Sequence, residues 1–125
     1  MTVAIAGCGI AGLAAGLALA RAGHDVRILE QASDQREVGA GLQLAPNALK
    51  ALDWLGVMPA LAPTLLHPDR IEIRDGRGGG LLNTLPLGGM VARHGAAYAL
   101  VHRADLLAAL LETARAHAGL RIETG

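Results

Sequence analysis

Hydrophobic and polar positions recur with two different periods along the chain, and they predict interleaved strands and helices. The mostly apolar run at residues 2–6 and the apolar positions within residues 25–29 predict two short strands, the first of them buried. The small-residue segment between them, residues 10–22, predicts a helix that Gly23 ends. A strand, a helix and a second strand in this order form a βαβ unit. The pattern therefore favours an α/β fold with a parallel sheet.

The rest of the chain predicts two further helices and a second group of strands. Pro46 suits a first helical turn, and three leucines follow it on one face before Gly56 ends the helix. The segment DGRGGG, residues 75–80, reverses the chain and predicts a β-hairpin. Residues 31–44 are predicted to be a connection, polar at first and then glycine-rich. The remaining predicted elements are strands at 70–74, 81–85, 98–102 and 120–124 and a helix at 105–117.

Composition narrows the class of protein. Of the 125 residues, 52% are hydrophobic, but there is no Phe, one Trp and one Tyr, so small side chains must pack closely spaced elements. Eleven basic and eleven acidic residues cancel without forming blocks, which argues against a nucleic-acid surface or a polybasic membrane patch. A small ligand or a cofactor is the expected partner. Cys8 is the single cysteine, which fits a reducing, cytoplasmic location, and no histidine or cysteine spacing predicts a metal site.

The first twenty residues carry no charge, a length that also suits a membrane span. Much of this run is Ala and Gly, and no basic segment precedes it. Glycines interrupt it where a spanning helix would continue. A strand, a loop and a helix outside any membrane are therefore the preferred interpretation.

The segment GCGIAG, residues 7–12, matches the GxGxxG pattern between a predicted strand and a predicted helix. In this pattern Gly7 permits the tight turn, Gly9 lets a pyrophosphate approach the backbone, and Gly12 lets the helix pack on the strand. Glu30 ends the second strand, where its carboxylate would accept hydrogen bonds from ribose hydroxyls and repel a 2′-phosphate. The predicted nucleotide is thus FAD or NAD, and the alternative is a glycine turn that serves packing alone.

Two further segments carry a resemblance to a known family. REVGAGLQLAPNALKALDWLG at 36–56 and VHRADLLAALLETA at 101–114, together with the glycine motif, resemble the N-terminal part of the class A flavoprotein aromatic hydroxylases. The salicylate hydroxylase and 3-hydroxybenzoate 6-hydroxylase type is the most similar subgroup. The resemblance implies a Rossmann-type FAD-binding domain with a parallel sheet like that of glutathione reductase. It divides the chain into 1–68 and 98–125 of that domain, with 69–97 as an inserted hairpin from an incomplete substrate domain.

The resemblance also implies a set of FAD-binding residues. The pyrophosphate would lie among the glycines and Ala11, the adenosine ribose at Glu30 and Gln31, and the ribityl chain and flavin ring near Gly41 and Gln43. Arg36 would reach the ribose or phosphates, and Arg103 is expected to be buried at the start of a helix with the pyrophosphate as its anionic partner. Alternatives are a salt bridge from Arg103 to Asp105, a solvated Arg36 and a merely structural Gln43. The set is Gly7, Gly9, Ala11, Gly12, Glu30, Gln31, Arg36, Gly41, Gln43 and Arg103.

The family's activity would be hydroxylation of a small aromatic acid by O2, with FAD as cofactor and NADH or NADPH as co-substrate. Relatives of this kind continue well beyond residue 125, so no catalytic residue is predicted, and the fragment alone is expected to be inactive. The hairpin is expected to lack partner strands, which favours self-association into a homo-oligomer or disorder. Two alternatives stay open: another Rossmann-type oxidoreductase, such as an NAD-dependent dehydrogenase or a flavin amine oxidase, and a non-catalytic nucleotide-binding module.

Overall fold

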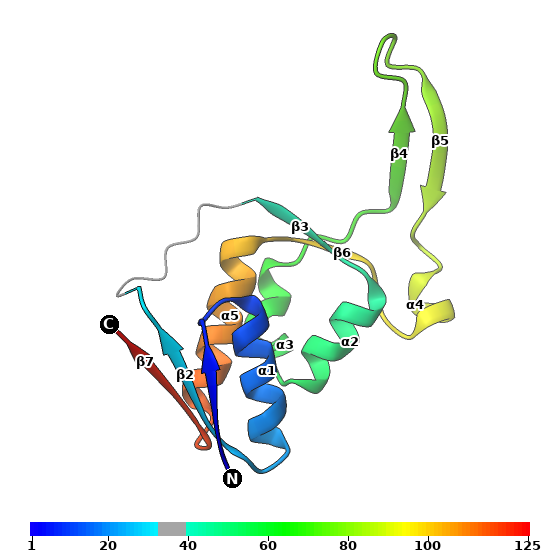
Figure 1. Cartoon of the computed structure of the whole chain (residues 1–125). Helices are drawn as coiled ribbons and strands as arrows, with labels where there is room; N and C mark the ends of the chain where they lie inside the picture. Colours follow the sequence, from blue (N-terminus) through cyan, green and yellow to red (C-terminus); the bar gives the residue numbers. More distant parts are fainter. Residues whose placement is uncertain (33–39) are drawn as a thin grey trace.

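The structure is a computed structural model that describes residues 1–32 and 40–125. Figure 1 shows the course of the chain. In chain order the elements are β1 (Thr2–Ala6), α1 (Ile10–Arg21), β2 (Asp25–Glu30), β3 (Gly41–Leu44), α2 (Pro46–Trp54), α3 (Met58–Leu61), η1 (Ala62–Thr64), β4 (Arg70–Arg74), β5 (Leu81–Pro86), α4 (Met90–His94), β6 (Ala99–His102), α5 (Arg103–Ala116) and β7 (Leu120–Thr124).

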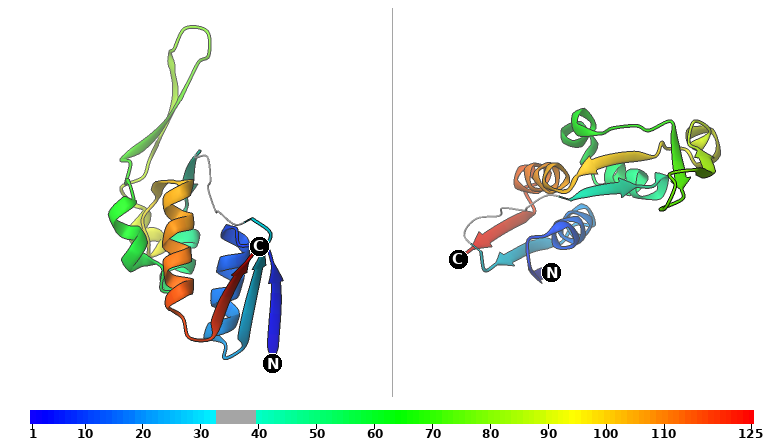
Figure 2. Two further views of the ribbon diagram at one scale, coloured as in Figure 1. Left: turned by 90° about the vertical axis from the view of Figure 1, so that its left-hand side faces the viewer. Right: turned by 90° about the horizontal axis from the view of Figure 1, so that it is seen from above.

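The centre of the fold is a parallel sheet of three strands in the order β1, β2, β7. The register pairs Ile5 with Ile28 and Ile28 with Ile122, so these side chains point to the same face. Helices α1 and α5 cover that face, and none of the helices in residues 1–32 and 40–125 lies on the opposite face (Figure 2). The predicted α/β class and the parallel sheet are confirmed.

The hydrophobic core lies between this sheet and the helices. Its fully buried side chains include Ile28 of β2, Leu13 and Leu17 of α1, and Leu110 of α5. The helix approaches the sheet closely, because a Cβ at Gly16 would lie 2.8 Å from Ile28 Cδ1. The expectation that the first strand is buried is wrong: no residue of β1 is buried. The reason is that β1 is an edge strand whose outer face lacks a covering layer.

A second, antiparallel pair joins β3 to β6, with Gly41 opposite His102 and Leu44 opposite Ala99. Leu66 forms an isolated antiparallel bridge to Leu100 on the other side of β6. The connection predicted for residues 31–44 thus contains a strand that the sequence pattern did not reveal. Helix α2 begins at Pro46 as predicted, and the short helices α3 and α4 were not predicted.

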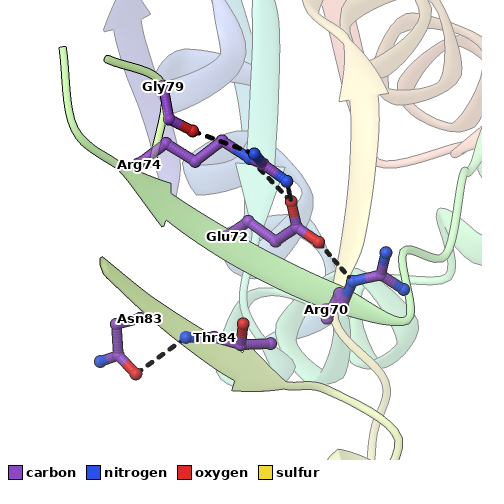
Figure 3. A network of polar contacts seen from close by, with 6 residues as sticks. All are labelled: Arg70, Glu72, Arg74, Gly79, Asn83 and Thr84. Atoms are coloured by element: carbon purple, nitrogen blue, oxygen red, sulfur yellow. Dashed lines mark hydrogen bonds and ion pairs between the residues drawn. The ribbon is translucent and has the colours of Figure 1, made fainter. Parts of the chain in front are cut away.

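Strands β4 and β5 form the predicted antiparallel hairpin, which projects from the rest of the chain (Figure 1). Glu72 accepts hydrogen bonds from Arg70 Nε at 2.7 Å and Arg74 Nη2 at 2.7 Å (Figure 3). These ion pairs lower the pKa of Glu72, first through Arg70 and then through Arg74. They are exposed to solvent, so they contribute little to stability. Every residue of β5 is exposed, hence the hairpin has no core of its own.

Among residues 1–32 and 40–125, no helix is long and apolar enough to cross a membrane. The uncharged N-terminal segment is divided between β1 and α1. Helix α1 has 12 residues and is therefore about 18 Å long, well below the roughly 30 Å of a hydrocarbon core.

Candidate cofactor-binding site

The glycine motif forms the turn from β1 into α1, and two of its glycines are required by the protein itself. Gly7 has a φ of +95°, a conformation that residues with a side chain rarely adopt, and its N–H donates to the Leu29 carbonyl oxygen at 2.7 Å. A Cβ at Gly12 would overlap the Gly7 carbonyl oxygen. The roles predicted for these two residues, a tight turn and close packing of helix on strand, match this geometry.

Gly9 differs from its neighbours because nothing in the fold requires a glycine there. Its φ of −79° and ψ of −176° are open to any residue, and a Cβ would meet no atom within 4 Å. Gly9 is the N-cap of α1, which has no side-chain cap and no acidic residue in its first turn. The first N–H groups of a helix lack intrahelical partners and carry partial positive charge. The open space at Gly9 therefore fits an anionic group such as a pyrophosphate.

Glu30 is fixed beside this turn by backbone hydrogen bonds. Its Oε1 accepts from Ala32 N at 2.9 Å and its Oε2 accepts from Cys8 N at 2.8 Å. The bond from Ala32 and then the bond from Cys8 lower the pKa of Glu30. The carboxylate is thus held ionised next to the glycine turn, and each oxygen keeps a further lone pair for a hydroxyl donor.

A hollow of about 470 Å³ lies at the carboxyl ends of β2 and β7. Glu30 and the adjacent Gln31 line it at the end of β2, and Thr124 and the adjacent Gly125 line it at the end of β7. Thr124 and Gly125 were not among the predicted site residues. Their contribution depends on the parallel pairing of Glu30 with Thr124, which the order of the elements alone did not fix. The hollow is in the range of small-ligand sites and adjoins the proposed ribose-binding carboxylate.

The other predicted residues gather where β3 meets β6. Arg103 N donates to the Ala40 carbonyl oxygen at 3.0 Å, which ties the start of α5 to the start of β3. Gln43 Oε1 accepts a hydrogen bond from the Tyr98 hydroxyl at 2.7 Å. The expected burial of Arg103 is wrong: as the first residue of α5 it is exposed. Arg36 lies outside the described residues.

Both groups of residues lie at one end of the molecule. Figures 1 and 2 show the N-termini of α1 and α5 at the same end as the carboxyl ends of the three parallel strands. Strand ends and helix N-termini that meet in this way form the usual ligand site of an α/β sheet. No group of three His, Cys, Asp or Glu side chains positioned to hold a metal occurs in the described part of the chain.

Comparison with known proteins decides which nucleotide this geometry serves. The family described as FAD binding domain matches residues 1–125, the whole chain. The chain belongs to this FAD-binding domain family. The expectation of FAD as cofactor is therefore confirmed, and the alternative of an NAD-dependent dehydrogenase is set aside.

The similar proteins are flavin monooxygenases. A 3-hydroxybenzoate 6-hydroxylase from Polaromonas naphthalenivorans is 42% identical over 116 residues, which are 92% of this chain and 29% of that protein. The tetrameric form of 2-methyl-3-hydroxypyridine-5-carboxylic acid oxygenase superposes with a TM-score of 0.84 at 30% identity, over 98% of this chain and 31% of that one. Klebsiella pneumoniae HpxO, solved with FAD and uric acid, has a TM-score of 0.80 at 27% identity, over 98% and 30%. This FAD-binding domain spans about 30% of the length of such relatives.

Proposed function

We propose that the chain is the FAD-binding part of a flavoprotein monooxygenase that hydroxylates a small aromatic acid with O2 and NADH or NADPH. The observation that carries the proposal is the open backbone at Gly9, above the uncapped N-terminus of α1 and next to the anchored carboxylate of Glu30. The reaction class follows from the similar hydroxylase and oxygenase, whose names give aromatic acids as substrates.

In this proposal the N–H groups of α1 and the backbone of Gly9 hold the FAD pyrophosphate, with Gly7, Ala11 and Gly12 around it. Glu30 accepts hydrogen bonds from the adenosine ribose hydroxyls, because its carboxylate is ionised and already oriented. Gln31 lines the hollow at the carboxyl ends of β2 and β7, which would hold the adenosine.

The β3–β6 pair would orient the other half of the cofactor. Gly41 offers open backbone, since a Cβ there would meet nothing within 4 Å, and Gln43 is held by Tyr98. Arg103, an exposed residue in the first turn of α5, would contact the phosphates. Arg36 would reach the ribose or phosphates. Bound FAD would supply the redox chemistry, while these residues bind and orient it.

The proposal also assigns parts of the chain to domains. Residues 1–68 and 98–125 would belong to the FAD-binding domain, and residues 69–97 to a substrate domain. The exposed hairpin supports this assignment, because an isolated two-stranded hairpin without a core is marginally stable and needs a covering partner. The related oxygenase was solved as a tetramer, which supports self-association of the whole protein.

The test is a visible absorption spectrum of the longest polypeptide that contains this chain, taken after desalting and after addition of NADH. We expect a flavin spectrum that bleaches faster when salicylate or 3-hydroxybenzoate is present. A colourless protein that takes up no added FAD would overturn the proposal. A flavin spectrum whose bleaching ignores aromatic acids would retain FAD and overturn the hydroxylase assignment.

A further inference from the structure

The peptide unit that joins Gly7 to Cys8 is held at both of its polar ends. Its N–H group donates to Glu30 Oε2 at 2.8 Å. Its carbonyl oxygen, on Gly7, occupies the position that a Cβ of Gly12 would take, in the first turn of α1. A trans peptide directs these two groups to opposite sides. The end of β2 therefore lies on one side of this peptide, and α1 lies on the other.

The local conformation of the turn does not fix this orientation by itself. Gly7 has no side chain and adopts a φ of +95°. Gly9 is a glycine too, so the residues on both sides of Cys8 have the widest range of backbone conformations. Contacts from outside the turn must therefore select one conformation.

The contacts that do so come from the last two residues of β2. The Leu29 carbonyl oxygen accepts a hydrogen bond from Gly7 N at 2.7 Å, and the Glu30 side chain accepts the next N–H group along the turn. Cys8 is only 2% exposed, so water has little access to replace the carboxylate as acceptor. The carboxylate is itself oriented, because its Oε1 accepts from Ala32 N at 2.9 Å. One strand thus binds two successive N–H groups of the turn, the second through a side chain.

The orientation of the peptide matters for an anion at the turn. With its N–H directed at Glu30, the partly negative carbonyl oxygen of Gly7 is seated against Gly12, where only a glycine leaves room for it. Half a rotation of the peptide would direct this oxygen to the side of Glu30, which lines the hollow at the carboxyl ends of β2 and β7. The oxygen would then lie on the side from which the nucleotide would approach, and it would repel a phosphate.

We propose that Glu30 is a positioning residue as well as a ribose acceptor, because its carboxylate fixes the Gly7–Cys8 peptide in the orientation that leaves the turn open to an anion. The inference rests on the function proposed above and adds a role that needs no ribose. It predicts that Glu30 strengthens nucleotide binding even when the ligand has no ribose hydroxyl for it to bind.

Two variants and one control test this role. Glu30→Met keeps an unbranched side chain and removes both acceptor oxygens. Glu30→Gln keeps one oxygen, which can replace only one of the two hydrogen bonds, so it should restore part of the effect. Glu112→Met is the matched control, because Glu112 is an exposed carboxylate of α5 and its loss changes the net charge equally.

The first measurement observes the peptide directly. Cys8 is the single cysteine, so 15N-cysteine labels one backbone amide of the 125-residue chain. We expect Glu30→Met to move this amide proton resonance upfield and to speed its hydrogen exchange about tenfold or more, because a hydrogen bond to a charged group is lost. Glu112→Met should leave both unchanged. A Cys8 amide with the parental shift and exchange rate in Glu30→Met would overturn the proposal.

Glu30→Gln decides the same question if Glu30→Met does not fold. A neutral amide oxygen accepts a weaker hydrogen bond than a carboxylate, so the Cys8 amide resonance should still move upfield, by a smaller amount. A parental chemical shift in this variant would also overturn the proposal.

The second measurement separates positioning from ribose recognition. The probes are FAD and an FAD analogue whose adenosine ribose lacks both hydroxyls, each titrated into the longest polypeptide. We expect Glu30→Met to weaken binding of both probes, the analogue by about tenfold or more, and Glu112→Met to weaken neither. If Glu30 acted on the ribose alone, Glu30→Met would bind the analogue as tightly as the parent or more tightly, since a negative charge near the phosphates is gone. That result would overturn the positioning role.

The parent protein distinguishes failure of this inference from failure of the proposed function. If the parent binds FAD and the affinity for the analogue does not depend on Glu30, the positioning role is wrong and the cofactor assignment stands. If the parent does not bind FAD, the proposed function fails. A Cys8 amide resonance that depends on Glu30 would then still show that this carboxylate orders the glycine turn.

Discussion

Gly9 and Gly12 belong to the same motif, yet the structure predicts different consequences when each is replaced by alanine. A Cβ at Gly12 would overlap the carbonyl oxygen of Gly7, which is backbone and cannot rotate away. Overpacking of this kind costs about 1–3 kcal/mol. For a chain of 125 residues, Gly12→Ala should therefore lower the melting temperature by about 3–15 °C.

Gly9→Ala should leave the free energy of unfolding almost unchanged. The new methyl group meets no protein atom within 4 Å. Alanine is a poorer N-cap than glycine, but it restricts the unfolded chain more, and these two effects oppose each other within about 1 kcal/mol. The methyl group would instead occupy the space proposed for the pyrophosphate. We expect FAD affinity to fall at least about tenfold, or 1.4 kcal/mol.

The assay pairs thermal unfolding of the 125-residue chain with FAD titration of the longest polypeptide, for each variant and the parent. The reasoning predicts that Gly12→Ala loses stability and that Gly9→Ala loses affinity alone. Wild-type FAD affinity in a folded Gly9→Ala protein would refute the placement of the pyrophosphate. An unchanged melting temperature for Gly12→Ala would refute the packing argument.

Three further predictions follow from the described contacts. Backbone hydrogen bonds lower the pKa of Glu30 in the folded state, so its ionised form adds stability that is lost as the pH falls through that pKa. Glu30→Gln removes the carboxylate. In urea unfolding, the variant should therefore lose less stability than the parent between about pH 5 and pH 3. Gly16→Ala should lower the free energy of unfolding by about 1–3 kcal/mol in the same assay, because its Cβ would clash with Ile28 Cδ1. Ile28→Val removes this atom. Adding Gly16→Ala to Ile28→Val should therefore cost less than adding it to the parent. The exposed pair of Arg27 and Glu123, 2.8 Å apart, should add little, so Arg27→Met should barely change the melting temperature at high salt.

The sequence predicted β1, β4, β7 and the start of β2 to the residue, because apolar residues in these strands either follow one another, as in β1, or alternate with charged residues. It missed β3, whose four residues include two polar or glycine positions and gain a strand conformation by pairing with β6. The exposure of β1 was also missed. Burial depends on which layers cover a strand, and periodicity in a five-residue run does not report that.

Some residues of the candidate site could likewise be predicted from the sequence, and others could not. Gly7, Gly9, Gly12 and Glu30 were found because their spacing along one βαβ unit encodes their positions relative to one another. The hydrogen bond from Tyr98 to Gln43 joins residues 55 positions apart. This hydrogen bond depends on the register of β3 against β6, so no local sequence pattern predicts it. Thr124 and Gly125 likewise line the hollow at the carboxyl ends of β2 and β7 because these two strands pair.

The structure also separates glycines that the sequence motif treats alike. Gly7 is explained by its positive φ, and Gly12 and Gly16 are explained by close contacts of α1 with the turn and the sheet. A stable fold would select these three without any ligand. Gly9 has an ordinary conformation and open space around it, so neither strain nor packing accounts for it. The proposed approach of an anionic pyrophosphate to the backbone would account for it, so the proposal of a nucleotide site depends more on Gly9 than on the other glycines of the motif.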